Sequence, residues 1–184
     1  MSGGAADEHP ELGKILVTED ELRAKIAELG ARIGADYEGL DPLLICVLRG
    51  AFVFMADLAR AVPASVEIDF MAVASYGSST RTSGVVRIVK DLDTELAGRH
   101  VILVEDIIDS GLTLRYLRRM LAARNPASFE VCALLIRDTV PEVDLAGLRY
   151  TGFRIPRDFV VGYGLDAGQK WRNLPDIRVW GGPR

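Results

Sequence analysis

Cysteine is scarce in this chain, and its scarcity excludes several classes of protein. The 184 residues include two cysteines, Cys46 and Cys132, which are too few for a disulfide framework or a four-thiolate zinc site. Both lie inside apolar runs, LLICVL and FEVCALLI, where cysteine acts as a small buried hydrophobic residue. Because disulfides persist mainly in oxidising compartments, we expect reduced thiols and a cytoplasmic protein.

Long apolar runs and an excess of positive charge are also missing. No run reaches the roughly 18–20 apolar residues that span a bilayer, and the opening MSGGAADEHP lacks the basic-then-apolar order of a signal peptide. The 22 Lys and Arg residues against 26 Asp and Glu give a net charge of −4. Nucleic acids and membrane surfaces attract basic proteins, so we expect neither as a partner.

The composition, 49% hydrophobic and 26% charged, is that of an ordinary globular protein. A length of 184 residues favours one domain, and no internal repeat or linker divides the chain. Residues 1–13 are small and polar without periodicity, which predicts a flexible N-terminal tail. The folded domain is then expected over residues 14–184.

Helical and strand-like segments alternate along this domain. Thr18 and Glu21 form a capping-box pattern ahead of apolar residues at helical spacing, which predicts a helix over residues 19–36. The remaining patterns predict helices at 52–62 and from Thr113, and strands at 43–48, 66–76, 85–92, 101–106, 129–136, 148–153 and 159–164. This alternation indicates an α/β fold, with a mainly parallel twisted sheet and helices on both faces. Ligands of such sheets bind beyond the carboxyl ends of the strands.

The strongest motif, VILVEDIIDSGLTLRYL, occupies residues 101–117. Glu105 and Asp106 stand where the buried strand is expected to end, and Asp109 follows. Ser110, Gly111 and Thr113 then open a helix, whose free N–H groups and dipole favour an anion such as phosphate. The motif lacks the lysine of GxxxxGK[ST] and also lacks GxGxxG, so it is neither of those nucleotide loops.

The acids in this motif require an explanation of their own, because carboxylates repel a nearby phosphate. Glu105 and Asp106 can accept hydrogen bonds from sugar hydroxyls, which together with the phosphate turn describes a ribose 5-phosphate site. The same residues also suit an ordinary helix N-terminus, with acids for the dipole and hydroxyls for capping. On this motif alone both interpretations stay open.

The segment EDIIDSGLTL resembles the phosphoribosyl-pyrophosphate motif of the type I phosphoribosyltransferases, in the form of the hypoxanthine/guanine (6-oxopurine) enzymes. Three more segments are similar to that family in the same order: VLRGAFVFMADL, SYGSSTRTSG and IPRDFVVGYGLDAGQKWRNLP. The resemblance covers about residues 15–180. It implies a single α/β domain with a small hood and a mobile lid loop.

The resemblance also implies roles for the residues of the motif. Glu105 and Asp106 would hold the ribose hydroxyls, and both would lie near the metal. Asp109 would be the general base that takes the purine N7 proton. The 5-phosphate would be bound by the turn Ser110, Gly111, Leu112 and Thr113.

Pyrophosphate binding is implied for other segments. Arg49-Gly50 matches the family's pyrophosphate loop, where a cis non-proline peptide bond is expected, and Arg172 matches its pyrophosphate-binding arginine. Asp166 matches the ligand of Mg²⁺, a hard cation suited to a diphosphate. Ser75 and Tyr76 match the start of the lid.

The implied purine site combines stacking and edge recognition. Phe159 would stack on the base, Val160 would contact its edge through the backbone, and Asp166 lies at the same site. Arg137 stands where the family usually has the lysine that meets O6, and its planar guanidinium is not equivalent to an ammonium. Ala167 replaces a common aromatic residue after Asp166. These two departures leave the choice among hypoxanthine, guanine and xanthine open.

The implied activity is Mg²⁺-dependent transfer of a phosphoribosyl group from phosphoribosyl pyrophosphate to N9 of hypoxanthine or guanine, by a homodimer or homotetramer. One alternative is a regulator of the same fold that binds RNA, although the acidic composition and the set Glu105, Asp106 and Asp109 argue against it. A second is a xanthine-preferring enzyme, and a third is a protein that acts only as an oligomer partner.

Overall fold

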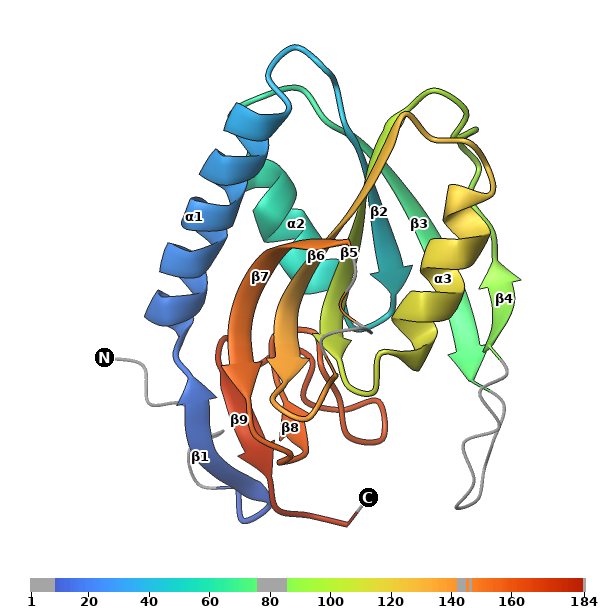
Figure 1. Ribbon diagram of the computed structural model, residues 1–184. Helices are drawn as coiled ribbons and strands as arrows, with labels where there is room; N and C mark the ends of the chain where they lie inside the picture. The colour runs from blue at the N-terminus through green and yellow to red at the C-terminus, as the bar shows by residue number, and fades with distance from the viewer. Residues whose placement is uncertain (1–8, 76–85, 142–144, 146, 184) are drawn as a thin grey trace.

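A mainly parallel sheet forms the centre of the computed structural model, which describes residues 9–75, 86–141, 145 and 147–183. Within these residues the sheet has six strands in the order β4-β3-β2-β5-β6-β7 (Figure 1). All neighbours are parallel except β3 and β4. The strands are β2 (Leu43–Leu48), β3 (Glu67–Ser75), β4 (Val86–Lys90), β5 (His100–Ile108), β6 (Ser128–Arg137) and β7 (Leu148–Ile155).

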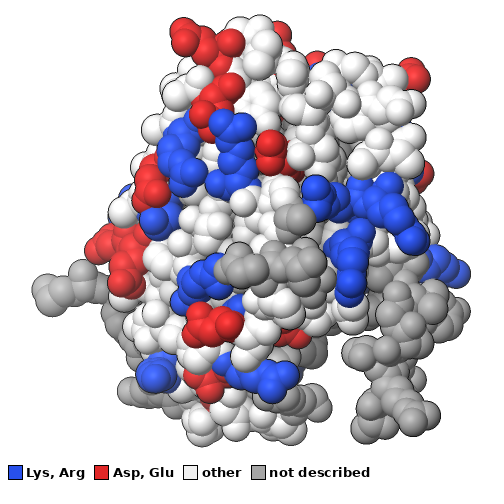
Figure 2. Space-filling model, in the orientation of Figure 1, with Lys and Arg blue, Asp and Glu red and all other residues white. Residues whose placement is uncertain are grey.

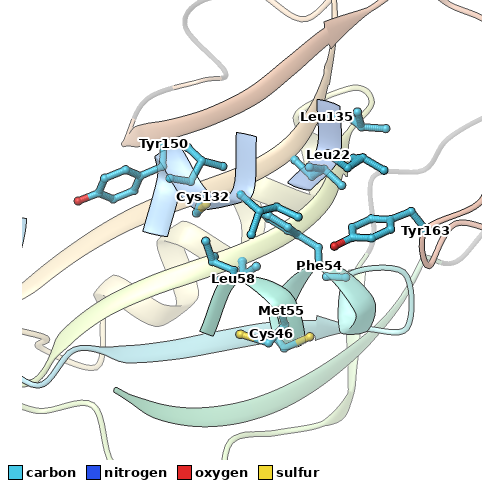
Figure 3. Close-up of a cluster of buried hydrophobic side chains, with 14 of the residues drawn as sticks. Leu22, Cys46, Phe54, Met55, Leu58, Cys132, Leu135, Tyr150 and Tyr163 are labelled. Atoms are coloured by element: carbon cyan, nitrogen blue, oxygen red, sulfur yellow. The ribbon is translucent and has the colours of Figure 1, made fainter. Parts of the chain in front are cut away.

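Helices cover both faces of this sheet, as the alternating pattern predicts. Helices α1 (Glu19–Asp36) and α2 (Phe52–Ala61) share one apolar cluster with the strands, whereas α3 (Leu112–Ala122) packs into a second cluster on the other face. The central strands are continuous apolar runs because alternate residues enter the two clusters. Leu44 and Cys46 of β2 thus join the first cluster (Figure 3), and Leu43 and Ile45 join the second.

The predicted capping box begins α1. The Thr18 N–H donates to Glu21 Oε2 at 2.8 Å, and the Glu21 N–H donates to Thr18 Oγ1 at 3.3 Å. These bonds satisfy two groups that have no partner within the helix. Cys46 and Cys132 are both free and buried, as the sequence predicts.

A smaller antiparallel sheet forms the expected hood. It contains β1 (Leu12–Val17), β9 (Ile177–Trp180) and β8 (Val160–Val161), in the order β1-β9-β8. In Figure 1 this sheet lies at the end of the molecule toward which the arrowheads of β5, β6 and β7 point. The hood therefore stands over the edge of the main sheet where ligands of α/β folds bind.

Several sequence predictions need correction at their boundaries. Leu12 and Gly13, assigned to the flexible tail, lie in β1, which the pattern did not predict because its partner β9 is far away in sequence. The strand predicted at 159–164 is reduced to Val160–Val161. Strand β5 continues to Ile108, so Glu105 and Asp106 lie before its end and not at its end, where the sequence placed them.

The surface carries both signs of charge. Figure 2 shows positive side chains gathered over α3, which contains Arg115, Arg118 and Arg119, and mixed charges along α1. In the part of the chain that the structure describes, no helix is both long and apolar enough to cross a membrane.

Candidate active site

Two cavities flank the end of β5, below the hood. Each cavity is named for the ligand that the sequence resemblance assigns to it. The purine-side cavity has a volume of about 570 Å³ and is lined by Asp109, Ser110, Arg137, Thr139, Pro141, Arg157 and Phe159. The pyrophosphate-side cavity has a volume of about 360 Å³ and is lined by Leu48, Arg49, Gly50, Asp106, Asp166, Arg172 and residues of β3 and β4. Residues from β2, β5, β6 and the hood thus meet at the edge of the sheet where the sequence places the site.

The loop after β2 approaches its neighbours without room for a side chain. A Cβ atom on Gly50 would overlap the Asp106 carboxylate, and one on Gly164 would overlap the Gly50 carbonyl oxygen. Gly164 also has a φ of +98°, a conformation that favours glycine. The cis peptide bond expected at Arg49-Gly50 is found one bond earlier, between Leu48 and Arg49, so that expectation was wrong by one residue.

The two acids of β5 are held in low-dielectric surroundings. Glu105 is 7% exposed, and its burial beside the charge of Asp106 raises its pKa well above the ordinary range. Burial raises the pKa of Asp106 to about 6, although backbone N–H groups and the Arg172 guanidinium oppose this rise. The Ile107 N–H donates to Asp106 Oδ1 at 2.8 Å. Without a ligand, burial therefore opposes the ionisation of both carboxyl groups.

The predicted phosphate turn has the conformation of an anion site at a helix start. Gly111 is left-handed with a φ of +75° and precedes α3, whose N-terminus has no side-chain cap. The Leu112 N–H makes a long hydrogen bond of 3.4 Å to Ser110 Oγ. Helix N–H groups and the positive end of the dipole remain directed outward, which suits a phosphate monoester.

Arg137 connects Asp109, the predicted general base, to the segment that leads from β7 to the hood. It is only 6% exposed, and its Nε donates to Asp109 Oδ1 at 3.0 Å. Its Nη1 donates at 2.6 Å to the carbonyl oxygens of both Pro156 and Asp158. The Asp109 side chain itself is 75% exposed. Arg137 therefore holds an accessible carboxylate in place, with much of its donor capacity already engaged.

The pyrophosphate-side cavity pairs cations with acids. Arg172 Nη2 lies 2.7 Å from Asp166 Oδ1, and Arg172 Nη1 donates to the Gly164 carbonyl oxygen at 2.8 Å. In the described residues, no three His, Cys, Asp or Glu side chains form a metal-binding group. Mg²⁺ usually takes one or two carboxylates with phosphate oxygens and water. The carboxylates of Asp106 and Asp166 line the same cavity and match this kind of magnesium coordination.

The structure brings together most, but not all, of the residues that the sequence singles out. The two cavities contain Arg49, Gly50, Asp106, Asp109, Ser110, Arg137, Phe159, Asp166 and Arg172. Val160 begins β8 and is buried, and Glu105 lines neither cavity. Ser75 ends β3, whereas Tyr76 and the rest of the predicted lid lie outside the described residues. The lid remains a prediction.

Comparison with known families and proteins identifies the family of this chain. Residues 16–167 match the family model described as "Phosphoribosyl transferase domain". The chain belongs to the phosphoribosyl transferase family. A protein of Mycobacterium tuberculosis (strain ATCC 25618 / H37Rv) named hypoxanthine-guanine phosphoribosyltransferase is 50% identical over 182 residues, which cover 95% of this chain and 90% of that protein.

Solved structures of phosphoribosyltransferases have the same fold. A hypoxanthine phosphoribosyltransferase from Staphylococcus aureus matches with a TM-score of 0.90 and 35% identity, over 97% of this chain and 96% of the other. A hypoxanthine-guanine phosphoribosyltransferase from Bacillus anthracis matches with a TM-score of 0.86 and 44% identity, over 92% of this chain and 99% of the other. The predicted single-domain α/β fold is confirmed.

Sequence reasoning missed three polar residues at this phosphoribosyl transferase site. Thr139 and Arg157 line the purine-side cavity, and Gln169 contacts both arginines of the pyrophosphate side. Thr139 lies just beyond Arg137, and Arg157 lies just before Phe159. Their closeness in sequence to predicted site residues was therefore the signal that could have identified them. Gln169 lies three residues from both Asp166 and Arg172, so the same signal was available for it. Its contact with Arg49 spans 120 positions and had no such signal.

The raised pKa of Asp106 predicts that this residue lowers the stability of the ligand-free protein. The folded-state value of about 6 exceeds the ordinary 3.8, so the folded state holds a proton that the unfolded chain has released. Stability then falls as pH rises from about 4 to about 6, by up to about 3 kcal/mol. We expect Asp106→Asn to raise the melting temperature at pH 7.5 by several degrees, with no gain near pH 4.

Differential scanning calorimetry across this pH range measures the effect. Asp20→Asn, at a carboxylate that is 92% exposed on α1, is the matched control and should change little. A gain for Asp106→Asn that stays constant with pH, or a loss at pH 7.5, would contradict the assignment. The same variant should lose stabilisation by phosphoribosyl pyrophosphate.

Proposed function

We propose that this chain is a purine-salvage enzyme that transfers the 5-phosphoribosyl group of phosphoribosyl pyrophosphate to N9 of hypoxanthine or guanine. The products are IMP or GMP and pyrophosphate. One observation supports this most: a cavity lined by Arg49 and Arg172 and a cavity lined by Asp109 and Phe159 lie on the two sides of the β5–α3 turn. The relatives named hypoxanthine-guanine phosphoribosyltransferase support the same reaction.

The proposed substrate position follows from the donors and acceptors on each side. The turn Ser110 to Thr113 binds the 5-phosphate through backbone N–H groups and hydroxyls. Glu105 and Asp106 accept hydrogen bonds from the ribose hydroxyls, which compensates for the burial of these acids. Arg49 and Arg172 bind the pyrophosphate, for which a guanidinium fork is well suited.

The reaction exchanges one bond at C1 of the ribose. The bond from C1 to the pyrophosphate oxygen breaks, pyrophosphate leaves with the electron pair, and N9 of the base bonds to the opposite face of C1. Asp109 accepts the proton that the base loses at N7. Phe159 and the backbone of Val160 orient the ring, so that much of the rate enhancement comes from holding the two substrates in line.

Magnesium has a defined place in this proposal. When bound, Mg²⁺ would neutralise charge on the pyrophosphate leaving group, and Asp166 and Asp106 are the carboxylates that would hold it. Arg172, which lies 2.7 Å from Asp166, then keeps that carboxylate oriented toward the cavity.

The proposal includes the partners and the location of the protein. Its substrates are phosphoribosyl pyrophosphate and a 6-oxopurine base, and it acts as a homodimer or homotetramer in the cytoplasm. Neither nucleic acid nor membrane takes part. Sedimentation velocity of the purified protein distinguishes a monomer from the proposed oligomers.

An assay with a panel of bases tests the proposal directly. The protein is incubated with Mg²⁺, phosphoribosyl pyrophosphate and each of hypoxanthine, guanine, xanthine and adenine, and nucleotides are separated by chromatography. We expect nucleotide from hypoxanthine or guanine and none from adenine, whose 6-amino group cannot accept from Arg137. Absence of nucleotide from every oxopurine would refute the proposed activity.

Xanthine remains a second candidate base because of the guanidinium groups in the purine-side cavity. Arg137 and Arg157 both line it, and xanthine adds a second carbonyl acceptor and ionises near neutral pH. We expect Arg137→Lys to lower kcat/KM for the preferred oxopurine about 5- to 30-fold, the equivalent of about 1–2 kcal/mol for hydrogen bonds lost at a buried group. The KM for phosphoribosyl pyrophosphate should stay the same. Unchanged values for every base would show that a lysine serves equally well.

The role of Asp109 as general base predicts a loss of turnover without a comparable loss of binding. Removing such a group typically lowers the rate about 10²–10⁴-fold, so Asp109→Asn should lower kcat by at least about 10²-fold. The dissociation constant of phosphoribosyl pyrophosphate, measured by calorimetry, should change less than threefold. Asp138→Asn, an exposed acid beside Arg137, is the control. Equal losses in kcat and in binding would argue against proton transfer by Asp109.

A further inference from the structure

Gln169 lies in a tight turn of the hood segment that lines the pyrophosphate-side cavity. Ala167 and Lys170 exchange backbone hydrogen bonds of 3.2 and 3.1 Å across this turn. Gln169 has a left-handed φ of +70°. Because the turn is closed by its own backbone bonds, the Gln169 side chain extends from a fixed base.

Three hydrogen bonds connect Gln169 to predicted binding residues. Its Oε1 accepts from Arg49 Nη1 at 2.8 Å and from Arg172 Nη2 at 3.2 Å. Its backbone N–H donates to Asp166 Oδ2 at 2.8 Å. Gln169 thus contacts both arginines and the carboxylate to which pyrophosphate binding and metal binding are assigned.

Arg49 and Arg172 differ in what else holds them. Arg172 is also held by Asp166 and by the Gly164 carbonyl oxygen. Among the described residues, the bond to Gln169 is the one polar contact of the Arg49 side chain. An arginine side chain loses considerable rotamer entropy when it is ordered, so Arg49 depends on Gln169 for its position.

The chemistry of the bridging group suits an anion site. Two neighbouring guanidinium groups repel each other. The acceptor oxygen that they share offsets part of this repulsion. The amide of Gln169 is neutral, so it orders both cations without cancelling their charge. The cations therefore retain their attraction for a pyrophosphate.

We infer that Gln169 is a positioning residue, which holds Arg49 and Arg172 together over the cavity so that both meet pyrophosphate. This inference rests on the proposed function and adds to it a residue that does not itself touch the reacting atoms. What matters is the acceptor oxygen and not the amide nitrogen. A methionine at this position should therefore fail to act in its place, and a glutamate should hold the two arginines but cancel part of their charge.

Calorimetric titration with Mg²⁺ and pyrophosphate tests this inference in three variants. Gln169→Met, which keeps the length of the side chain and removes the acceptor, should weaken pyrophosphate binding about 5- to 10-fold. Gln169→Glu keeps the acceptor but brings a negative charge to the two arginines, so it should also weaken pyrophosphate binding. Asn173→Leu removes an exposed amide from the same segment without a contact to either arginine, and it should not change the binding.

Steady-state kinetics and melting temperature separate positioning from a structural effect. For Gln169→Met we expect a rise in KM for phosphoribosyl pyrophosphate, an unchanged KM for the base and an unchanged melting temperature. If Gln169→Met binds pyrophosphate as the natural protein does, or if Gln169→Glu binds it more tightly than the natural protein, the inference is overturned. If pyrophosphate binding responds as expected but no base yields nucleotide, the inference about the anion site holds and the proposed reaction fails.

Discussion

The carboxylate of Asp106 lies against the backbone of Gly50, and Gly50 in turn lies against Gly164 of the hood. This contact joins the end of β5, the loop after β2 and the segment that carries Asp166 and Arg172. It exists only because neither glycine has a Cβ atom and because parallel strands end at one edge of the sheet. A side chain at either position would push the hood away from β5 and separate the groups of the pyrophosphate-side cavity.

Burial of the two acids determines the electrostatics of the site. Glu105 and Asp106 are buried, so their ionisation is unfavourable without a ligand, and the guanidinium groups of Arg49 and Arg172 line the same cavity as Asp106. A ribose diol would supply hydrogen bonds to the acids, and a pyrophosphate would supply negative charge to the cations. We therefore expect these groups to lower the stability of the free protein, a common feature of binding sites built for a ligand.

The two cavities divide the chemistry between the strands and the hood. Strand β6 supplies Arg137, which is hydrogen-bonded to Asp109 and to the carbonyl oxygens of Pro156 and Asp158 in the segment that leads from β7 to the hood. The hood supplies Asp166, Gln169 and Arg172, which are tied to one another and to Arg49. In each cavity, therefore, one arginine makes a hydrogen bond to a distant part of the chain: Arg137 to Asp109, and Arg49 to Gln169.

Elements that depend on local pattern could be predicted from the sequence. The capping box at Thr18 and Glu21, the apolar runs of β2, β5 and β6, and the start of α3 each reflect neighbours a few residues apart. The candidate site was located because those strands end beside charged or glycine-rich segments. Strand β1 was missed because its stabilising partner, β9, lies at the opposite end of the chain.

By itself the sequence determined the α/β order of the elements, the turn at the start of α3 and the resemblance that named the family, since all three are written in consecutive residues. The tertiary structure alone decided that Arg137 is committed to Asp109 and that Gln169 bridges Arg49 and Arg172. It also placed the cis peptide bond before Arg49. These features depend on which segments the folded sheet and hood bring within a few ångströms of each other, and that proximity leaves no periodic trace along the chain.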